Sequence, residues 1–451
     1  MISDELVAPL AHPSSWQLAT LKSITTKIGS GATPTGGQAT YQATRENFAF
    51  VRSQNVFDRA FSEGGLAFIS DEQAGFLKSA ALQPDDLLLN ITGDGVTFAR
   101  ACRVPRSILP ACVNQHVSII RVDRSKVDPG YVLSYLTCPE IKPYIESFNA
   151  GGSRRAITKA HIESFVISIP PLNVQRQIAE LLDGLDDRIS LLRETNATLE
   201  AIALALFKSW FVDFDPVRAR VEGRAPEGMD EATAALFPDV FEESELGLVP
   251  KGWTVGSLGD VAVTVKQQLR AAELHAGLRY VGLEHIPRKS LSLNDWGSAD
   301  GLESDKTAFE EGDILFGKLR PYFHKVVVAP FDGVCSTDIL VLQSKVPSYF
   351  GIATMHLFST ALIDYADRLS NGAKMPRVSW KDLSAYPIVV PPAHVAGEFT
   401  SVIGHVLDSM TSNVNEAQTL AMVRDTLLPR LISGQLRLPE SVHSMEVSNG
   451  I

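Results

Sequence analysis

The chain of 451 residues repeats itself, and this internal repeat constrains its fold more than any other feature. Four motifs recur in the same order: Trp16–Leu21 as Trp253–Leu258, Phe50–Val56 as Tyr280–Ile286, Asp86–Leu89 as Asp313–Phe316, and Gly151–Pro171 as Gly372–Pro392. The spacing between copies falls from 237 to 221 residues and then stays at 221 as far as Phe211. The repeat predicts two similar halves, roughly residues 1–211 and 240–435, related by an internal pseudo-twofold.

Each half begins with segments that are typical of β-strands. Short apolar or alternating runs, such as Leu87–Leu89 and Val117–Val122, are separated by Gly, Pro, Asn and Asp. We therefore expect a mixed, β-rich α+β domain in each half. Pro170–Pro171 and Pro391–Pro392 mark where these domains end, because a residue that precedes proline disfavours the helical region.

Each half then ends in a segment with the 4-3 spacing of a coiled-coil seam. In the first copy the seam positions are Ile178, Leu182, Leu185, Ile189, Leu192, Asn196, Leu199, Ala203, Leu206 and Trp210. In the second copy they are Phe399, Ile403, Val406, Met410, Asn413, Ala417, Leu420, Arg424, Leu427 and Leu431, so the second seam is more polar. Both segments far exceed the usual helix of ~11–12 residues. The alternative is that each helix packs only on its own domain.

Two such helices, packed antiparallel, would form a rigid spacer. From Ile178 to Trp210 a helix rises about 48 Å at 1.5 Å per residue. The pairing would put the β-rich domains at opposite ends, turned by half a rotation, and Asn196 is suited to fix its register. This arrangement suits two short DNA half-sites about one helical turn apart, ~34 Å.

The expected fold class is therefore α+β, with two β-rich recognition domains separated by two long antiparallel helices in a coiled coil. The predicted boundaries are 1–172 for the first domain, 173–215 for the first helix, 216–246 for an acidic linker, 247–392 for the second domain, 393–436 for the second helix and 437–451 for a C-terminal tail.

The formal net charge of −11 argues against DNA binding, which needs Lys and Arg against phosphates. Residues 212–246, however, hold ten acidic and only three basic residues, so they contribute −7 and leave −4 for the rest of the chain. The imbalance lies mostly in one interdomain segment. The remainder is compatible with DNA reading by local basic loops, helped by a partner.

Nothing in the sequence predicts a membrane or a secreted protein. It has no run of 18 or more apolar residues, and its start lacks the basic region and apolar core of a signal peptide. Cys102, Cys112, Cys138 and Cys335 form no CxxC pair and no zinc-like spacing with His. We expect reduced thiols in a cytoplasmic protein.

Several segments resemble parts of catalytic or cofactor sites, and each lacks a residue or a structural context that such a site requires. Gly312–Lys318 nearly matches a phosphate-binding loop, but Leu follows where Ser or Thr would bind Mg²⁺. Gly29–Gly37 is glycine-rich without the strand–helix context of a dinucleotide site, so we expect a surface loop next to DNA. Asp213 and Asp215 have no third metal ligand nearby. His116 has no evident nucleophile, which favours a hydrogen-bonding role over general base catalysis.

Four runs resemble the specificity (HsdS) subunits of type I restriction–modification systems: Ile169–Gln175, Leu206–Arg218, Gly312–Tyr322 and Leu427–Gly434. They span nearly the whole chain in the family's order, on a twofold repeat with paired long helices. One departure concerns the start of the second helix. Gly397–Glu398 stands where the first copy has Arg176–Gln177, so the Gln that usually opens this helix is absent.

The resemblance implies a DNA-binding subunit without catalysis. It implies a bipartite target in double-stranded DNA with a nonspecific spacer. It also implies two methylation subunits that use S-adenosylmethionine, and restriction subunits that translocate DNA with ATP and Mg²⁺. No cofactor or metal is expected in this chain itself, and no membrane partner. The alternatives are a protein-binding coiled-coil scaffold, or the DNA-binding part of a fused nuclease or methyltransferase.

Base reading requires donors and acceptors on loops, with Arg favouring guanine and Asn or Gln favouring adenine. The candidates in the first domain are Arg52, Gln54, Asn55, Thr92, Arg154 and Arg155. Those in the second are Gln267, Gln268, Arg270, Lys318, Arg320, Tyr322, Lys374 and Arg377. Arg154, Arg155 and Lys374 occupy corresponding loops of the two copies, which suggests a shared phosphate clamp. Trp210, Phe211 and Phe214 either anchor a methylation subunit or cap the helix seam.

Overall fold

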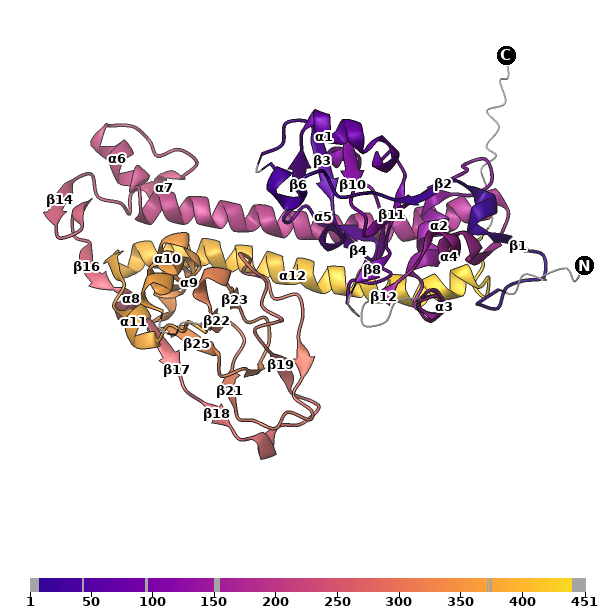
Figure 1. The fold of residues 1–451 in the computed structure, drawn as a ribbon. Coiled ribbons are helices and arrows are strands. Elements are labelled where there is room, and N and C mark those ends of the chain that lie inside the picture. Colours follow the sequence, from indigo (N-terminus) through magenta and orange to yellow (C-terminus); the bar gives the residue numbers. More distant parts are fainter. Residues whose placement is uncertain are drawn as a thin grey trace, which may run out of the picture. The chain divides into compact units, whose positions relative to one another are not determined.

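The computed structural model describes residues 8–42, 44–93, 96–149, 155–370, 372 and 375–439 (Figure 1). The chain forms two compact units. The first unit combines Met1–Ile189 with Thr419–Ile451, and the second is Ser190–Gln418. Each unit therefore contains one β-rich domain together with a segment of each long helix.

The first unit is built on two small sheets. One has the antiparallel order β2 (Thr25–Ser30), β11 (Val117–Val122), β7 (Leu87–Asn90), β9 (Ala101–Arg103), and the other has the order β10 (Ala111–Val113), β3 (Phe48–Val51), β6 (Ala67–Ile69). Leu88 and Ile119 from the first sheet pack against Phe50 and Val113 from the second. Shorter elements complete the domain: β4 (Val56–Phe57), β5 (Ala60–Phe61), β8 (Thr92–Gly93), β12 (Arg155–Ala156), α1 (Asp71–Phe76), α2 (Pro129–Thr137), α3 (Lys142–Ser147) and α4 (Lys159–Ser164).

The second unit repeats this topology. Its four-stranded sheet runs β17 (Ala262–Val265), β25 (Ile339–Ser344), β22 (Ile314–Gly317), β23 (Val326–Val328), and its second sheet runs β18 (Gln268–Leu269), β21 (Lys306–Phe309), β24 (Gly333–Cys335), β19 (Arg279–Val281), β20 (Gly297–Ser298). The parallel pair of β19 and β24 matches that of β3 and β10. Its helices are α8 (Leu258–Val261), α9 (Phe350–Phe358), α10 (Thr360–Leu369) and α11 (Trp380–Ser384). The predicted repeat is confirmed in the order of the four-stranded sheets, whereas the other sheet of the second unit is extended by β18 and β21.

A two-stranded pair closes each domain before its long helix begins. β1 (Gln17–Thr20) pairs antiparallel with β13 (Val166–Ile169), and β16 (Thr254–Ser257) pairs with β26 (Pro387–Val390). Each pair joins the start of a half to the strand that precedes its two consecutive prolines. The long helices therefore leave both domains at the same point of the fold.

The two long helices are α5 (Leu172–Phe211) and α12 (Ala393–Ile432), each of 40 residues. α5 begins just after its two prolines, where the buried amide of Gln175 donates to the carbonyl of Pro170 and accepts from the backbone N–H of Asp128. α12 begins at the equivalent residue, Ala393, although Glu398 stands where the first copy has Gln177, so this substitution does not shorten the helix.

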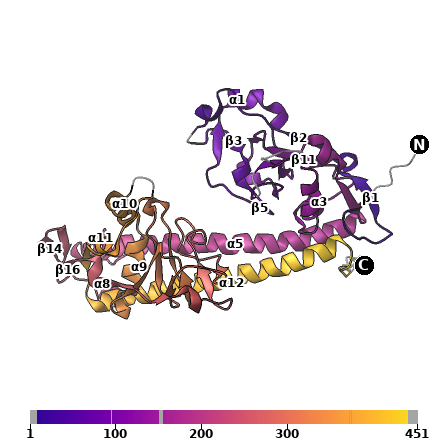
Figure 2. The ribbon, with the colours of Figure 1, turned by 60° about the horizontal axis from the view of Figure 1, so that its bottom comes forward.

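The helices pair with each other in both units, which confirms the predicted antiparallel packing. In the first unit the start of α5 meets the end of α12, where Ile178 and Leu182 share a core with Leu428 and Leu431 (Figure 1, Figure 2). In the second unit the direction is the same, because the end of α5 packs on the start of α12: Ala203, Phe207 and Trp210 share a core with Phe399 and Ile403.

Asn196 lies in this seam and hydrogen-bonds across it. Its side-chain N–H donates to the carbonyl of Met410 at 3.0 Å, and its oxygen accepts from the amide of Asn413 at 2.8 Å. Because Asn196 is buried and Asn413 partly buried, this pair of amides disfavours any register that would leave them without each other. Of the two polar positions in the second predicted seam, Asn413 is thus satisfied by Asn196, and Arg424 pairs with Asp186 in the first unit.

The burial of the seam departs from the predicted heptads in detail. Leu192 and Leu431 are buried as expected, whereas Leu185, Leu199, Leu206, Leu420 and Leu427 are only partly buried. Phe207 and Leu428, which the heptads did not select, are buried instead. A straight helix turns every 3.6 residues rather than 3.5, so the contact face drifts away from a strict seven-residue repeat.

The predicted acidic linker contains regular structure. α6 (Asp215–Val221), α7 (Glu231–Ala234) and the hairpin of β14 (Phe241–Ser244) with β15 (Gly247–Pro250) lie between the end of α5 and β16. The guanidinium of Arg220 donates to the backbone carbonyls of Ala234 and Ala235, which ties α6 to the end of α7. The carbonyl of Asp213 accepts from Arg218, and its carboxylate pairs with Lys208.

Two features are absent from the residues that the structure describes. None of their helices combines the length and the apolar character that crossing a bilayer requires. No three His, Cys, Asp or Glu side chains among them are grouped as metal ligands would be.

Candidate nucleic-acid interface

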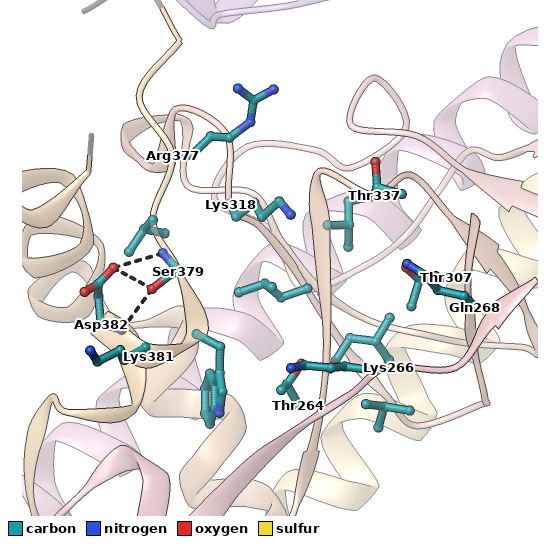
Figure 3. Close-up of a pocket in the computed structure, with 16 residues that line it drawn as sticks. Thr264, Lys266, Gln268, Thr307, Lys318, Thr337, Arg377, Ser379, Lys381 and Asp382 are labelled. Carbon is teal, nitrogen blue, oxygen red and sulfur yellow. Dashed lines mark hydrogen bonds between the residues drawn. The ribbon is translucent and has the colours of Figure 1, made fainter. Parts of the chain in front are cut away.

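A hollow of about 1040 Å³ opens at one edge of the four-stranded sheet of the second unit (Figure 3). β17 and β22 both run antiparallel to β25. Lys266 after β17, Lys318 after β22 and Thr337 before β25 therefore emerge at the same edge. The segment from Arg377 to Asp382 forms the opposite wall.

Four cationic side chains line this hollow: Lys266, Lys318, Arg377 and Lys381. The acid among the lining residues, Asp382, accepts from the backbone N–H and the hydroxyl of Ser379 and so caps the start of α11. The guanidinium of Arg377 also pairs with Asp338 at 3.0 Å. The second-unit hollow is therefore positive, with Gln, Thr and Ser side chains among the cations, which is the composition that phosphates and base edges attract.

Backbone hydrogen bonds hold the two walls together. The carbonyl of Lys318 accepts from Val378, and the N–H of Arg320 donates to Pro376. Leu319 and Arg377 form an isolated β-bridge between these segments. This contact fixes the backbone from which Lys318 and Arg377 reach the hollow.

A turn that follows Lys318 carries a second group of predicted residues. Arg320 and His324 both have φ of 52°, in the left-handed region, and between them Tyr322 is half exposed. The guanidinium of Arg288 lies 4.0 Å from the ring centre of Phe323, and that of Arg320 lies 5.9 Å from it. Arg320 and Tyr322 therefore follow Lys318 closely in the sequence, but they belong to a separate group of side chains around Phe323.

The structure brings only part of the predicted second-domain set together. Gln268, Lys318 and Arg377 line the hollow, and exposed Gln267 precedes Gln268 at its edge. Arg270 lies beyond β18, where its backbone N–H donates to Glu273. Lys374 lies outside the described residues. Lys266, Thr337 and Lys381 were not predicted; Lys266 directly precedes the predicted pair of glutamines, and nothing local in the sequence marks the other two.

Among the described residues, the equivalent edge of the first unit carries neutral polar side chains beside Arg155, which is paired with Glu146. Thr92 and Ala156, paired in β8 and β12, correspond to the bridged Leu319 and Arg377. The hydroxyl of Thr92 lies 2.6 Å from Nδ1 of His116. Hydrogen bonds join four side chains one after another: Thr33, Gln115, His116 and Thr92. We call this hydrogen-bonded series the His116 chain. Of these, only Thr92 was predicted to bind DNA.

The other first-domain candidates serve the fold. Asn55 is fully buried, donates to the carbonyl of Ser62 and accepts from the N–H of Arg52, so the prediction that it reads bases is wrong. Arg52 and Gln54 both donate to the carbonyl of Gly65. These bonds close a 14-residue loop, in which Asn and Arg satisfy backbone groups that the turn leaves unpaired.

The predicted phosphate clamp is described only in part. Arg154 and Lys374 lie outside the described residues. Arg155 pairs with Glu146 at 2.9 Å. That ion pair neutralises the guanidinium in the structure, so the clamp stays a prediction.

The aromatic residues at the end of α5 are buried within the second unit. Trp210, Phe211 and Phe214 pack with Trp253 and Phe399, with ring centres 4.8 to 6.1 Å apart. Of the two roles considered for them, capping of the seam fits this burial. A surface that anchors a partner would leave them accessible.

The two β-rich domains are attached to the long helices by different chemistry. In the first unit Arg59 is 3% exposed and pairs with Asp186 and Asp183 of α5, while Arg103 and Arg424 pair with the same two aspartates. Burial raises the pKa of Asp183, and its arginine partners oppose that rise.

In the second unit the charged group at this attachment is a glutamate, beside neutral hydrogen bonds such as those from Thr400 to Ser348 and from Gln418 to Asn294. Glu200 of α5 accepts from the hydroxyl of Ser290 at 2.7 Å and from the backbone N–H of Leu291. Burial raises the pKa of this carboxyl, against the hydrogen bonds. Leu291 and Leu293 are buried beside it.

Comparison with known proteins finds the same architecture. Residues 13–201 match the type I restriction modification DNA specificity domain. The HindI specificity subunit of Haemophilus influenzae is 24% identical, over 86% of this chain and 94% of that protein. The MjaIX specificity subunit of Methanocaldococcus jannaschii is 24% identical, over 73% of this chain and 74% of that protein. A type I restriction–modification S subunit from M. genitalium covers 94% of this chain with a TM-score of 0.51 and 13% identity, which shows a shared fold.

Proposed function

Residues 13–201 belong to the type I restriction modification DNA specificity domain family, and on this premise we propose that the chain selects a bipartite DNA target, one half-site with each β-rich domain. The similarity to specificity subunits extends over most of the chain, so the proposal covers both halves. The target is double-stranded DNA, in a prokaryotic cytoplasm.

One observation carries the proposal: equivalent sheet edges of the two halves bear different polar side chains. The second-unit hollow presents Lys318 and Arg377, where the first unit has Ile91 and the paired Thr92 and Ala156. Side chains at an edge of this kind discriminate bases by their donors and acceptors. A target made of two different half-sites requires two different binding edges, and the repeated framework provides them.

Phosphate contacts position such a protein, and base contacts specify its site. The cations of the second-unit hollow suit both roles, because lysine and arginine bind phosphates and arginine also binds guanine. The His116 chain is neutral when its histidine is neutral, so it suits base contacts alone. The chain's formal charge of −11 supports a division of labour in which partner subunits supply further phosphate contacts.

Catalysis belongs, in this proposal, to partner subunits. Two methylation subunits would bind S-adenosylmethionine and modify adenine, and restriction subunits would use ATP and Mg²⁺. This chain would hold none of these cofactors and would direct its partners to the target.

Selection from a pool of randomised DNA duplexes tests the proposal, using the full chain together with its methylation subunits. We expect two short fixed sequences separated by a spacer of constant length and free sequence. Mapping of methylated adenines in the host genome should return the same two half-sites. A single uninterrupted site, or no enriched sequence, would contradict the proposal.

A further inference from the structure

The loop between β10 and β11 holds an exposed glutamine, Gln115, where the second-unit hollow has Thr337. Both residues lie two positions before the first residue of the central strand, Val117 in β11 and Ile339 in β25. Thr337 lines the hollow in the second unit (Figure 3). Gln115 therefore occupies the DNA-facing edge of the first unit, if the proposed function holds for both halves.

The backbone that carries Gln115 is fixed on both sides. The N–H of Asn114 donates to the carbonyl of Val51, and the carbonyl of His116 accepts from the N–H of Ile91. The carbonyl of Asn114 also accepts from Gly31. A Cβ at Gly31 would lie 1.7 Å from the carbonyl oxygen of Val113, so only glycine lets the two loops approach this closely.

Both ends of the Gln115 amide are held by neighbours. Its oxygen accepts from the hydroxyl of Thr33 at 2.7 Å, and its nitrogen donates to Nε2 of His116 at 3.0 Å. For His116 to accept at Nε2, the proton of the neutral ring must be on Nδ1, which then donates to the hydroxyl of Thr92. The His116 chain therefore sets the orientation of the amide.

A glutamine amide has two N–H groups and two oxygen lone pairs. The His116 chain uses one of each, and the side chain is exposed. One donor and one acceptor remain, and these are the two kinds of group that pair with N7 and N6 of adenine in the major groove. Because the amide is already oriented, little side-chain freedom is left to lose on binding.

We infer that Gln115 is a specificity-determining residue that reads one adenine of the first half-site. The inference rests on the proposed function and goes further by naming the residue and the base. It separates Gln115 from Gln54, whose amide is bonded to the backbone of Gly65 within its own loop.

The test compares duplex selection by the full chain, in its complex with methylation subunits, for the wild type and for Gln115→Glu. A carboxylate cannot donate to N7 of adenine, and it accepts from the amino group of cytosine. We expect the wild type to fix adenine at one position of one half-site, by about 5- to 150-fold over other bases. Gln115→Glu should lose that preference, or turn it towards cytosine, and leave the other half-site unchanged.

Two further variants serve as controls. Gln83→Glu makes the same change at another exposed glutamine of the first unit, and should select the wild-type sequence throughout. Thr33→Val removes the donor to the amide oxygen, and should weaken the adenine preference without changing the base.

The outcomes separate the two ideas. If Gln115→Glu selects the wild-type sequence, or changes a position that the wild type fixes as another base, the inference about Gln115 is overturned while the bipartite target stands. If the wild type selects no sequence, both fall. Binding of each protein to its own best duplex confirms that the variants are folded.

Discussion

The two units use one framework for two different surfaces, and the contrast shows which parts of the framework are interchangeable. Strand order, the closing two-stranded pairs and the start of each long helix are shared. The sheet edge is not: the second unit has four cations, and the first has the His116 chain. The backbone thus fixes where recognition occurs, and side chains on its loops decide what is recognised.

The contrast extends to how each unit is held together. Both units pack buried apolar groups against the long helices; the first adds arginine–aspartate pairs to α5, and the second adds hydrogen bonds to Glu200. The units should therefore respond differently to the loss of a single side chain. Equivalent substitutions in the two units test this directly.

The largest difference is expected at the end of the helices. Phe211 in the second unit and Ile432 in the first are equivalent by the repeat, and both are buried. Phe211→Ala should cost about 4 kcal/mol, because it opens a cavity among Trp253, Trp210 and Phe399, and Ile432→Ala about 3 kcal/mol. Urea unfolding measures both, and hydrogen exchange shows which unit opens. An Ile432→Ala loss larger than that of Phe211→Ala would reverse the comparison.

The next effect concerns the attachment to α5. Arg59→Met leaves Asp183 and Asp186 with fewer partners in a partly buried place, and should destabilise the first unit by about 3 kcal/mol. Arg103 and Arg424 still pair with these aspartates, which keeps the loss from being larger.

The matched change in the second unit is milder. Glu200→Gln keeps an acceptor for Ser290 and Leu291 and removes a charge that burial disfavours, so the loss should be about 1 kcal/mol. Hydrogen exchange of peptides from each unit reports both variants. Equal losses of stability in the two variants would mean that the two domains depend equally on their charged attachment to α5.

Acid should affect the second unit first. His356 is buried among aromatic rings and its Nε2 has no hydrogen-bond partner among the described residues, so burial lowers its pKa from 6.5 to about 3. The unfolded chain binds a proton below pH 6.5 and the folded chain does not, so stability present above pH 6.5 is lost as pH falls.

At pH 5 this loss is about 2 kcal/mol. His324 adds to it, because burial lowers its pKa as well. Unfolding measured from pH 7.5 to 5 should show the loss, and His356→Gln should flatten it. His161→Gln in the first unit serves as the control. A wild-type stability independent of pH in this range would contradict the assignment.

Sequence predicted the fold better than the site, for a physical reason. The repeat and the heptads are periodic along the chain, so two 40-residue helices and their antiparallel pairing follow from the positions of apolar residues. Phe207 was missed because the contact face drifts from strict heptads. Gln115 in the first unit and Lys381 in the second were missed for the same reason, because each joins residues from distant segments only once the sheet of its own unit has formed.

Asn55 illustrates the opposite error. An asparagine in a polar loop looks available for a base, yet its amide satisfies the backbone of its own turn and is buried. Local side-chain-to-backbone bonds of this kind leave no mark on the composition of a loop. The amide of Gln115 bonds to side chains instead, which leaves one of its donors and one of its acceptors unused.

The last predicted effect separates phosphate contacts from base contacts. Lys318→Ala combined with Arg377→Ala should weaken binding of any duplex about tenfold and lower the slope of log K against log salt by about 2, since each phosphate contact contributes ~0.9. Thr92→Val, at the equivalent edge of the first unit, should change the selected bases and leave that slope as it is. Lys251→Ala with Lys345→Ala removes the same charge from exposed sites outside the hollow. This control could lower the slope as much as the Lys318→Ala, Arg377→Ala variant does. In that case the hollow makes no special phosphate contact. The edges of the two units would then differ in charge without differing in role.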